Sequence, residues 1–152
     1  MKKIKYLRWL IGFPTIALLI SMLAWSAPRN QIELFIENDN IEKAVHTYFD
    51  AEMKKDFQEI YRCLASSSVY KMSHNYQEFL EDVRDSPVRI LEYKIIDIYG
   101  LRKNHDKESY PGVERFVQTE VEVIIYYDDT QNKTFQNHSF TFLKEGGDWY
   151  KG

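Results

Sequence analysis

At 152 residues, the chain is long enough for one domain, and a hydrophobic fraction of 44% with 15% aromatic residues can give that domain a core. Residues 1–30 contain five basic residues and no acidic ones, so the rest of the chain has 15 basic against 23 acidic residues. Because this acidic body is repelled by phosphate groups, we expect no nucleic-acid partner.

The amino-terminal segment 1–28 is predicted to be a signal-anchor. The basic stretch "MKKIKYLR" precedes the 17 uncharged residues "WLIGFPTIALLISMLAW", with Trp9 and Trp25 at the two ends. A bilayer span needs about 20 residues, whereas the apolar region of a cleaved signal peptide has about 7–15, so the length favours one retained transmembrane helix in the lipid bilayer. Two alternatives stay open. Ala24 and Ser26 fit a cleavage site, which would give a secreted protein, and the segment could instead be a buried core helix.

The distribution of basic residues predicts the topology of the chain. Lys and Arg precede the uncharged stretch and are scarce just after it, so the positive-inside rule places residues 31–152 outside the cytoplasm. The expected location is therefore the cell membrane, as a single-pass protein with its C-terminal domain outside. The single cysteine, Cys63, excludes an intramolecular disulfide.

Residues 29–38 are interpreted as a linker, and residues 39–152 as an extracytoplasmic domain. The motif "DNIE" predicts a helix that begins at Asp39, with Glu42 completing a capping box. Its apolar residues recur every three or four positions, and they are Ile41, Ala44, Val45, Tyr48 and Ala51. A second helix is expected after Asp56 and a third, capped by Ser73, before Val83.

From "VRILEYKIIDIYG" onward, the pattern changes to the alternation of β-strands. Arg89, Leu91, Tyr93, Ile95, Asp97 and Tyr99 are expected on one face of this first strand. "FVQTEVEVIIYY" alternates most regularly, "TFQNHSFTFL" runs back, and "WYK" forms a short last strand after the turn "EGGD". The predicted fold class is α+β, with helices packed on a curved, cone-like antiparallel sheet.

With this order of elements, the chain resembles the nuclear transport factor 2-like superfamily, also called the cystatin-like cone fold. The resemblance covers about residues 39–152 and rests on "IEKAVHTYFDAEMKKDFQEIYRCLA", the late meander and "FLKEGGDWYKG". It implies a sheet wrapped around a cavity that the helices partly close. The superfamily contains enzymes similar to ketosteroid isomerase and polyketide cyclases, and also non-catalytic modules, including single-span envelope proteins. A fold alone does not imply which of these applies.

In this setting, Tyr48 and Asp97 are the candidate catalytic pair, since both could face the cavity and imitate part of an isomerase site. The structural alternative is that Tyr48 packs in the core and Asp97 is solvated at the end of a strand. The candidate ligand-binding or partner-binding residues are Tyr48, Tyr61, Tyr93, Asp97 and Trp149, because aromatic side chains with a polar tip suit cavity walls and interfaces. Trp149 is expected to act first as a folding residue that docks the last strand.

We expect no metal and no cofactor. The histidines His46, His74, His105 and His138 are scattered, and Asp128 and Asp129 fit a hairpin turn better than a calcium loop. Cys63 is expected to be a small buried side chain, since no hydrolase motif surrounds it.

The functional hypothesis is a non-catalytic binding or assembly module outside the cytoplasm, which engages an envelope protein partner or a ligand in its cone. The alternative is an exported small-molecule enzyme of the ketosteroid isomerase or polyketide cyclase type. An enzyme of this type requires an open pocket with a buried carboxyl of raised pKa.

Overall fold

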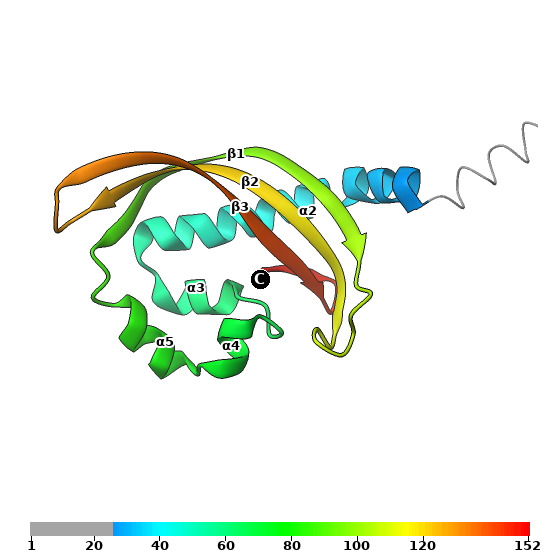
Figure 1. Cartoon of the computed structure of the whole chain (residues 1–152), viewed down its shortest axis with the longest axis horizontal. Helices are drawn as coiled ribbons and strands as arrows, with labels where there is room; N and C mark the ends of the chain where they lie inside the picture. The colour runs from blue at the N-terminus through cyan, green and yellow to red at the C-terminus, as the bar shows by residue number, and fades with distance from the viewer. Residues whose placement is uncertain (1–25) are drawn as a thin grey trace, which may run out of the picture. The chain divides into compact units, whose positions relative to one another are not determined.

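The computed structural model describes residues 26–152, and the predicted signal-anchor lies almost entirely outside them (Figure 1). The helices are α2 (Ser26–Lys54), α3 (Phe57–Cys63), α4 (Val69–Ser73) and α5 (Tyr76–Val83). The strands are β1 (Val88–Lys103), β2 (Val113–Tyr127), β3 (Asn132–Glu145) and β4 (Asp148–Lys151). Among these described helices, none combines the length and the hydropathy needed to cross a bilayer. The fold is α+β, as predicted.

Helix α2 begins earlier than the sequence predicts. It starts at Ser26, so Asp39 lies inside the helix and the expected linker 29–38 is helical. The Asn38 amide donates a 2.8 Å hydrogen bond to Glu42 Oε1 one turn later, which keeps this side chain from competing with the helical backbone. The predicted capping box at Asp39 is therefore wrong. The chain divides into two compact units between Ile36 and Glu37, and the unit Glu37–Gly152 contains the whole sheet and the short helices.

The region predicted to form a third helix contains two helices in the structure, α4 and α5. Ser68 caps α4, and Asn75 caps α5 through a capping box with Glu78. Ser73 was expected to begin a helix, but it ends one, because its hydroxyl donates back to the carbonyls of Val69 and Tyr70. Helix α3 begins after Asp56, as expected, and Asp56 caps it by accepting from the Glu59 amide at 3.1 Å.

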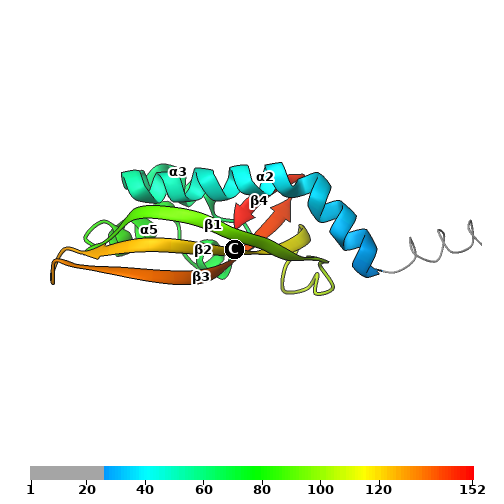
Figure 2. The ribbon, with the colours of Figure 1, turned by 90° about the horizontal axis from the view of Figure 1, so that it is seen from above.

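The four strands form one antiparallel sheet in the order β1-β2-β3-β4, as the predicted meander requires. Figures 1 and 2 show that the sheet is curved and that α3, α4 and α5 lie on its concave side, together with the second half of α2. Strand β2 buries one alternating face, as its sequence predicts. The residues on that face are Val117, Thr119, Val121 and Val123.

Strand β1 differs from its prediction, because the alternate residues from Arg89 to Tyr99 do not all lie on one face. Its register with β2 shifts between Ile90 and Glu92, between Ile95 and Asp97, and between Tyr99 and Arg102. Tyr93 and Ile95 lie opposite buried residues of β2, whereas Asp97 lies opposite Glu120 and Tyr99 opposite Gln118. Since directly paired residues share a face, the extra residue at the bulge between Ile95 and Asp97 moves Asp97 and Tyr99 to the outer face of the sheet.

Phe49 connects α2 to two strands. Its side chain is fully buried, stacks on Tyr93 with ring centroids 5.0 Å apart, and meets Phe140 edge-on at 5.3 Å. Ile41 and Val45, on the same face of α2, are also fully buried. This apolar stripe therefore fixes the helix against the concave side of β1 and β3.

Glu37 joins the last hairpin to α2. Its two carboxylate oxygens accept from Lys144 Nζ at 2.8 Å and from Trp149 Nε1 at 3.0 Å. Trp149 itself is buried, as expected for a folding residue, and Gly146 and Gly147 have φ values of 60° and 93°, which a tight turn after β3 requires. The short strand β4 is thus held by one indole ring and one largely buried ion pair.

This cluster predicts a pH dependence of stability. The hydrogen bond from Lys144 lowers the pKa of Glu37 from its ordinary value of 4.5, burial opposes this shift, and the bond from Trp149 supports it. A lowered pKa contributes stability that is present above pH 4.5 and is lost as the pH falls through the folded-state pKa. Glu37→Gln should therefore lower the free energy of unfolding by about 1 kcal/mol near neutral pH. In urea unfolding experiments, the free energy of unfolding of this variant should also fall less than that of the wild type as the pH is lowered.

Glu108→Gln is the matched control, because Glu108 is exposed in the loop between β1 and β2. Its unfolding free energy should follow the wild-type profile at every pH. Parallel profiles for the wild type and Glu37→Gln would contradict the assignment.

Candidate functional site

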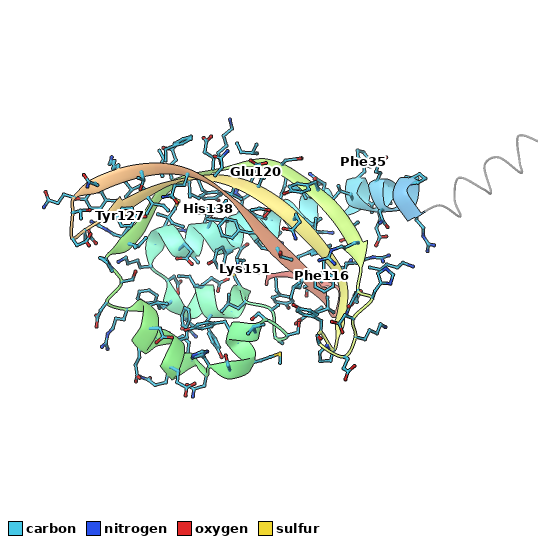
Figure 3. All side chains as sticks on the ribbon, in the orientation of Figure 1. Phe35, Phe116, Glu120, Tyr127, His138 and Lys151 are labelled. Atoms are coloured by element: carbon cyan, nitrogen blue, oxygen red, sulfur yellow. The ribbon has the colours of Figure 1, made fainter. Side chains whose placement is uncertain are left out.

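A cavity of about 990 Å³ opens between the concave side of the sheet and the short helices. Figure 3 labels Phe116 of β2 and Lys151 of β4, two of the residues that line this cavity. Most of the exposed cavity wall is apolar, with Ile60, Phe79, Val83, Phe116, Phe140 and Leu143 among its residues. The polar residues of the wall include Tyr48, Glu52, Ser68, Arg102, Asn104 and Lys151.

The Tyr48–Glu52–Lys151 group is the main polar feature of the cavity. Tyr48 and Glu52 are one helical turn apart on α2, and the Tyr48 hydroxyl donates a 2.6 Å hydrogen bond to Glu52 Oε1. Lys151 enters from β4, with Nζ 5.7 Å from the ring centroid of Phe140 and 6.0 Å from that of Tyr48. The site thus combines an acid, a phenol and an ammonium group within an apolar wall.

Burial shifts the pKa of all three members. It raises the pKa of the Glu52 carboxyl, against the hydrogen bond from Tyr48 and the positive charge of Lys151. It also raises the pKa of Tyr48 well above the ordinary value, and the nearby charge of Glu52 adds to this shift. Burial lowers the pKa of Lys151, while the charge of Glu52 opposes that change. Glu52 and Lys151 therefore each reduce the cost of keeping the other charged in a poorly hydrated place.

The position of Lys151 depends on backbone contacts with the loop after α3. The Ala65 amide donates to the Lys151 carbonyl at 2.7 Å, and Leu64 forms a parallel bridge with Lys151. Lys151 also follows the Trp149 anchor closely on the same short strand, so one hairpin fixes both residues.

The far end of the cavity is lined by a loop that Asn104 organises. Asn104 is buried, and its amide donates to the carbonyls of Tyr110 and Val113 at 2.9 and 3.1 Å. At the opposite rim, the Tyr70 hydroxyl donates to Asp82 Oδ2 at 2.6 Å, and this bond raises the pKa of Tyr70 to about 12. These contacts leave both ends of the wall preformed, because their polar side chains already have partners within the domain.

The structure does not bring the predicted pair Tyr48 and Asp97 together. Tyr48 lines the cavity, but Asp97 is exposed on the outer face, where its carboxylate accepts from the Ile98 amide at 2.8 Å. The bulge after Ile95 is the reason, because it reverses the side on which Asp97 emerges. Asp97 is therefore not part of the cavity site.

Tyr93 and Tyr61 also lie outside the cavity wall. The Tyr93 hydroxyl donates to Asp50 Oδ1 at 2.7 Å and lies 2.7 Å from His46 Nδ1, so it pins β1 to α2. Both partners, His46 and Asp50, are exposed residues of α2. Tyr61 donates to the His74 carbonyl at 3.0 Å within the helical layer.

Trp149 borders a separate hollow of about 510 Å³, not the main cavity. Cys63 lines the same hollow, and burial raises the pKa of its thiol to about 11, which keeps it protonated at neutral pH. Within residues 26–152, no group of three or more His, Cys, Asp or Glu side chains could hold a metal ion.

Glu52 and Lys151 are not among the site residues predicted from the sequence. Glu52 could have been found, because it lies four residues after Tyr48 and so shares its side of the helix. Lys151 carries no such signal, since only the return of the last strand toward α3 brings it to the cavity.

Comparison with known proteins gives little further guidance. No family model matches the chain, and no protein of curated function matches it. Among solved structures, the chain is similar to Aln2 from a Streptomyces species, with 8% sequence identity and a TM-score of 0.48 over 78% of this chain and 85% of that one. The function therefore has to be inferred from the chain's own residues.

The Glu52 environment can be tested by titration. In carbon-13 NMR of the labelled protein, the Glu52 carboxyl should titrate above 4.5. Lys151→Met should move this pKa further upward, because a positive charge that favours the carboxylate is removed, and Tyr48→Phe should also raise it through the lost hydrogen bond.

Asp97→Asn serves as the control for long-range effects, and it should leave the Glu52 titration unchanged. A downward shift of the Glu52 pKa in Lys151→Met, or no shift in either variant, would refute the arrangement.

Proposed function

We propose that residues 37–152 form a binding module that takes up a small amphipathic organic ligand in the cavity. The observation that carries this proposal is a cavity of about 990 Å³, at the upper end of the size common for small-molecule sites, with the half-buried Tyr48–Glu52–Lys151 group in a mostly apolar wall. The cone-like sheet of the family resemblance fits the same interpretation.

The side chains favour a ligand with an apolar body and one anionic or hydrogen-bond-accepting group. Aromatic and aliphatic residues, among them Phe79, Phe116 and Leu143, provide the apolar contacts. Lys151 is the cavity's ammonium donor. Its Nζ donates to the Gly152 carbonyl, and among the described residues no Asp or Glu carboxylate lies within 4.0 Å of it. A ligand anion that reaches Nζ would gain a charge-assisted hydrogen bond in a poorly hydrated place.

We further propose that the module is held at the outer side of a membrane by the segment 1–28. This part of the proposal is supported by the sequence alone, through the basic residues before the uncharged stretch 9–25 and their scarcity after it. An envelope protein remains the proposed partner, because a tethered binding module can present its ligand only to proteins within reach of the membrane.

The ligand proposal can be tested with 8-anilinonaphthalene-1-sulfonate, which combines an aromatic body with an anionic sulfonate. It should bind the folded full-length chain in detergent with saturable fluorescence. Lys151→Met should weaken binding about tenfold through loss of the charged donor, as isothermal calorimetry would measure.

Lys133→Met provides the matched control, since Lys133 is exposed near the hairpin between β2 and β3 and does not line the cavity. Equal weakening in both variants, or binding that never saturates, would count against the cavity as the binding site.

The second candidate is an exported enzyme, and one observation favours it: Glu52 is a half-buried carboxyl of raised pKa that accepts a hydrogen bond from a tyrosine. In such an enzyme, Glu52 would exchange a proton with the substrate, and Tyr48 would hold the carboxyl in position. Glu52→Gln would then abolish turnover while leaving sulfonate binding largely unchanged, which separates the enzyme from a pure binding module.

The membrane proposal predicts fractionation and topology. The full-length protein should stay in the membrane pellet after alkaline carbonate extraction, and a protease added outside intact cells should remove its C-terminal domain. A chain recovered in the soluble cytoplasmic fraction would overturn this proposal without affecting the cavity site.

A further inference from the structure

The two borders of the sheet are different. Strand β1 forms one border, and β3 forms the other from Asn132 to Thr141, because β4 pairs only with the segment 142–145. Figure 2 shows β3 running along its side of the sheet without a neighbouring strand over most of its length. Both borders present backbone groups that could pair with another strand.

The β1 border has features that prevent such pairing. Its register with β2 shifts at three places, so the strand is bent and irregular. It also carries charged side chains along its length, which are Arg89, Glu92, Lys94, Asp97, Arg102 and Lys103. Irregular, charged strands are a common protection against edge-to-edge association.

The β3 border lacks these features. From Asn132 to Lys144, its pairing with β2 continues without a bulge. The stretch 134–142, "TFQNHSFTF", contains no charged residue and no proline. Phe135 on this strand is 63% exposed, whereas most large apolar side chains of the sheet are covered.

The backbone of β3 shows which groups are available. The Gly152 amide donates to the Thr141 carbonyl at 2.9 Å, so the polar groups of Thr141 point away from β2. Because this direction alternates along an antiparallel strand, the amides and carbonyls of Ser139, Asn137 and Phe135 also point outward. Among residues 26–152, no backbone group outside the regular pairing bonds to these three residues.

We propose that this β3 border pairs, antiparallel, with the same border of a second copy of the chain. A twofold axis at Asn137 would place Asn137 opposite Asn137 of the second copy and Phe135 opposite Ser139. Each of these residues has its free amide and carbonyl toward the axis, so each pair exchanges two hydrogen bonds. The result is one continuous eight-stranded sheet made from two four-stranded sheets.

Charge is the reason for choosing a second copy as the occupant. The self-pairing of a charged strand brings like charges face to face, which destabilises a sheet. Over the stretch 134–142 this cannot happen, since no residue there is charged. The nearest charged residue of the strand, Lys133, lies just beyond this pairing, because Gly152 of the same chain already occupies the place opposite Thr141.

The pairing can be tested by cysteine crosslinking of the full-length chain in detergent micelles. In a Cys63→Ser background, Asn137→Cys should give a covalent dimer on mild oxidation, because Cα atoms of a hydrogen-bonded antiparallel pair are about 5.5 Å apart and suit a disulfide. Glu92→Cys, an exposed position on the β1 border, is the matched control and should stay monomeric. Equal crosslinking of the two variants would overturn the proposal.

A second measurement needs no oxidation. In sedimentation equilibrium, Asn137→Lys should weaken dimerisation at least about tenfold, since two ammonium groups would meet at the axis, whereas Asn137→Ser should dimerise like the wild type. Circular dichroism would check that both variants are folded. A wild-type chain that is monomeric at every concentration, or one whose β3 border takes up an added extended peptide without self-association, would contradict the proposal.

Discussion

The packing of Phe49 is the contact on which the rest of the domain depends. This fully buried ring stacks on Tyr93 of β1 and meets Phe140 of β3, so it holds α2 against two strands that are not neighbours in the sheet. The residues on either side of Phe49 then have fixed directions. Tyr48 turns toward the cavity, and Asp50 turns toward the Tyr93 hydroxyl. The helix that closes the core is thus also the helix that presents the candidate site.

The cavity exists because the helices do not fill the concave side of the sheet. Three bulges curve β1, and the short helices α3, α4 and α5 cover the resulting hollow without occupying it. Buried charge is costly in such a space unless it is paired. Glu52 and Lys151 reduce this cost for each other, but the effect of burial on each pKa remains larger than the effect of the other charge. A polar group of a ligand could therefore stabilise either charge further.

Much of the fold could be predicted from the sequence because its signals are local. The alternation of "FVQTEVEVIIYY" predicts β2 and its buried face, and the glycine turn predicts the closing hairpin. The errors have equally local causes. Asp39 lies inside α2 instead of beginning a helix, Ser73 closes a helix instead of opening one, and the bulge after Ile95 reverses Asp97. A period of two cannot reveal a bulge, because one added residue inverts every position that follows.

By itself, the sequence determined the α+β class, the order of helices before strands and the docking of the last strand by Trp149, since each follows from periodicity or turn chemistry within a few residues. The basis for a membrane anchor also lies entirely in the sequence. Only the tertiary structure decided which side chains meet in the cavity. Glu52 and Lys151 are 99 positions apart in the chain, and their place on one cavity wall depends on how a curved sheet returns its last strand to the helices, which no local pattern encodes.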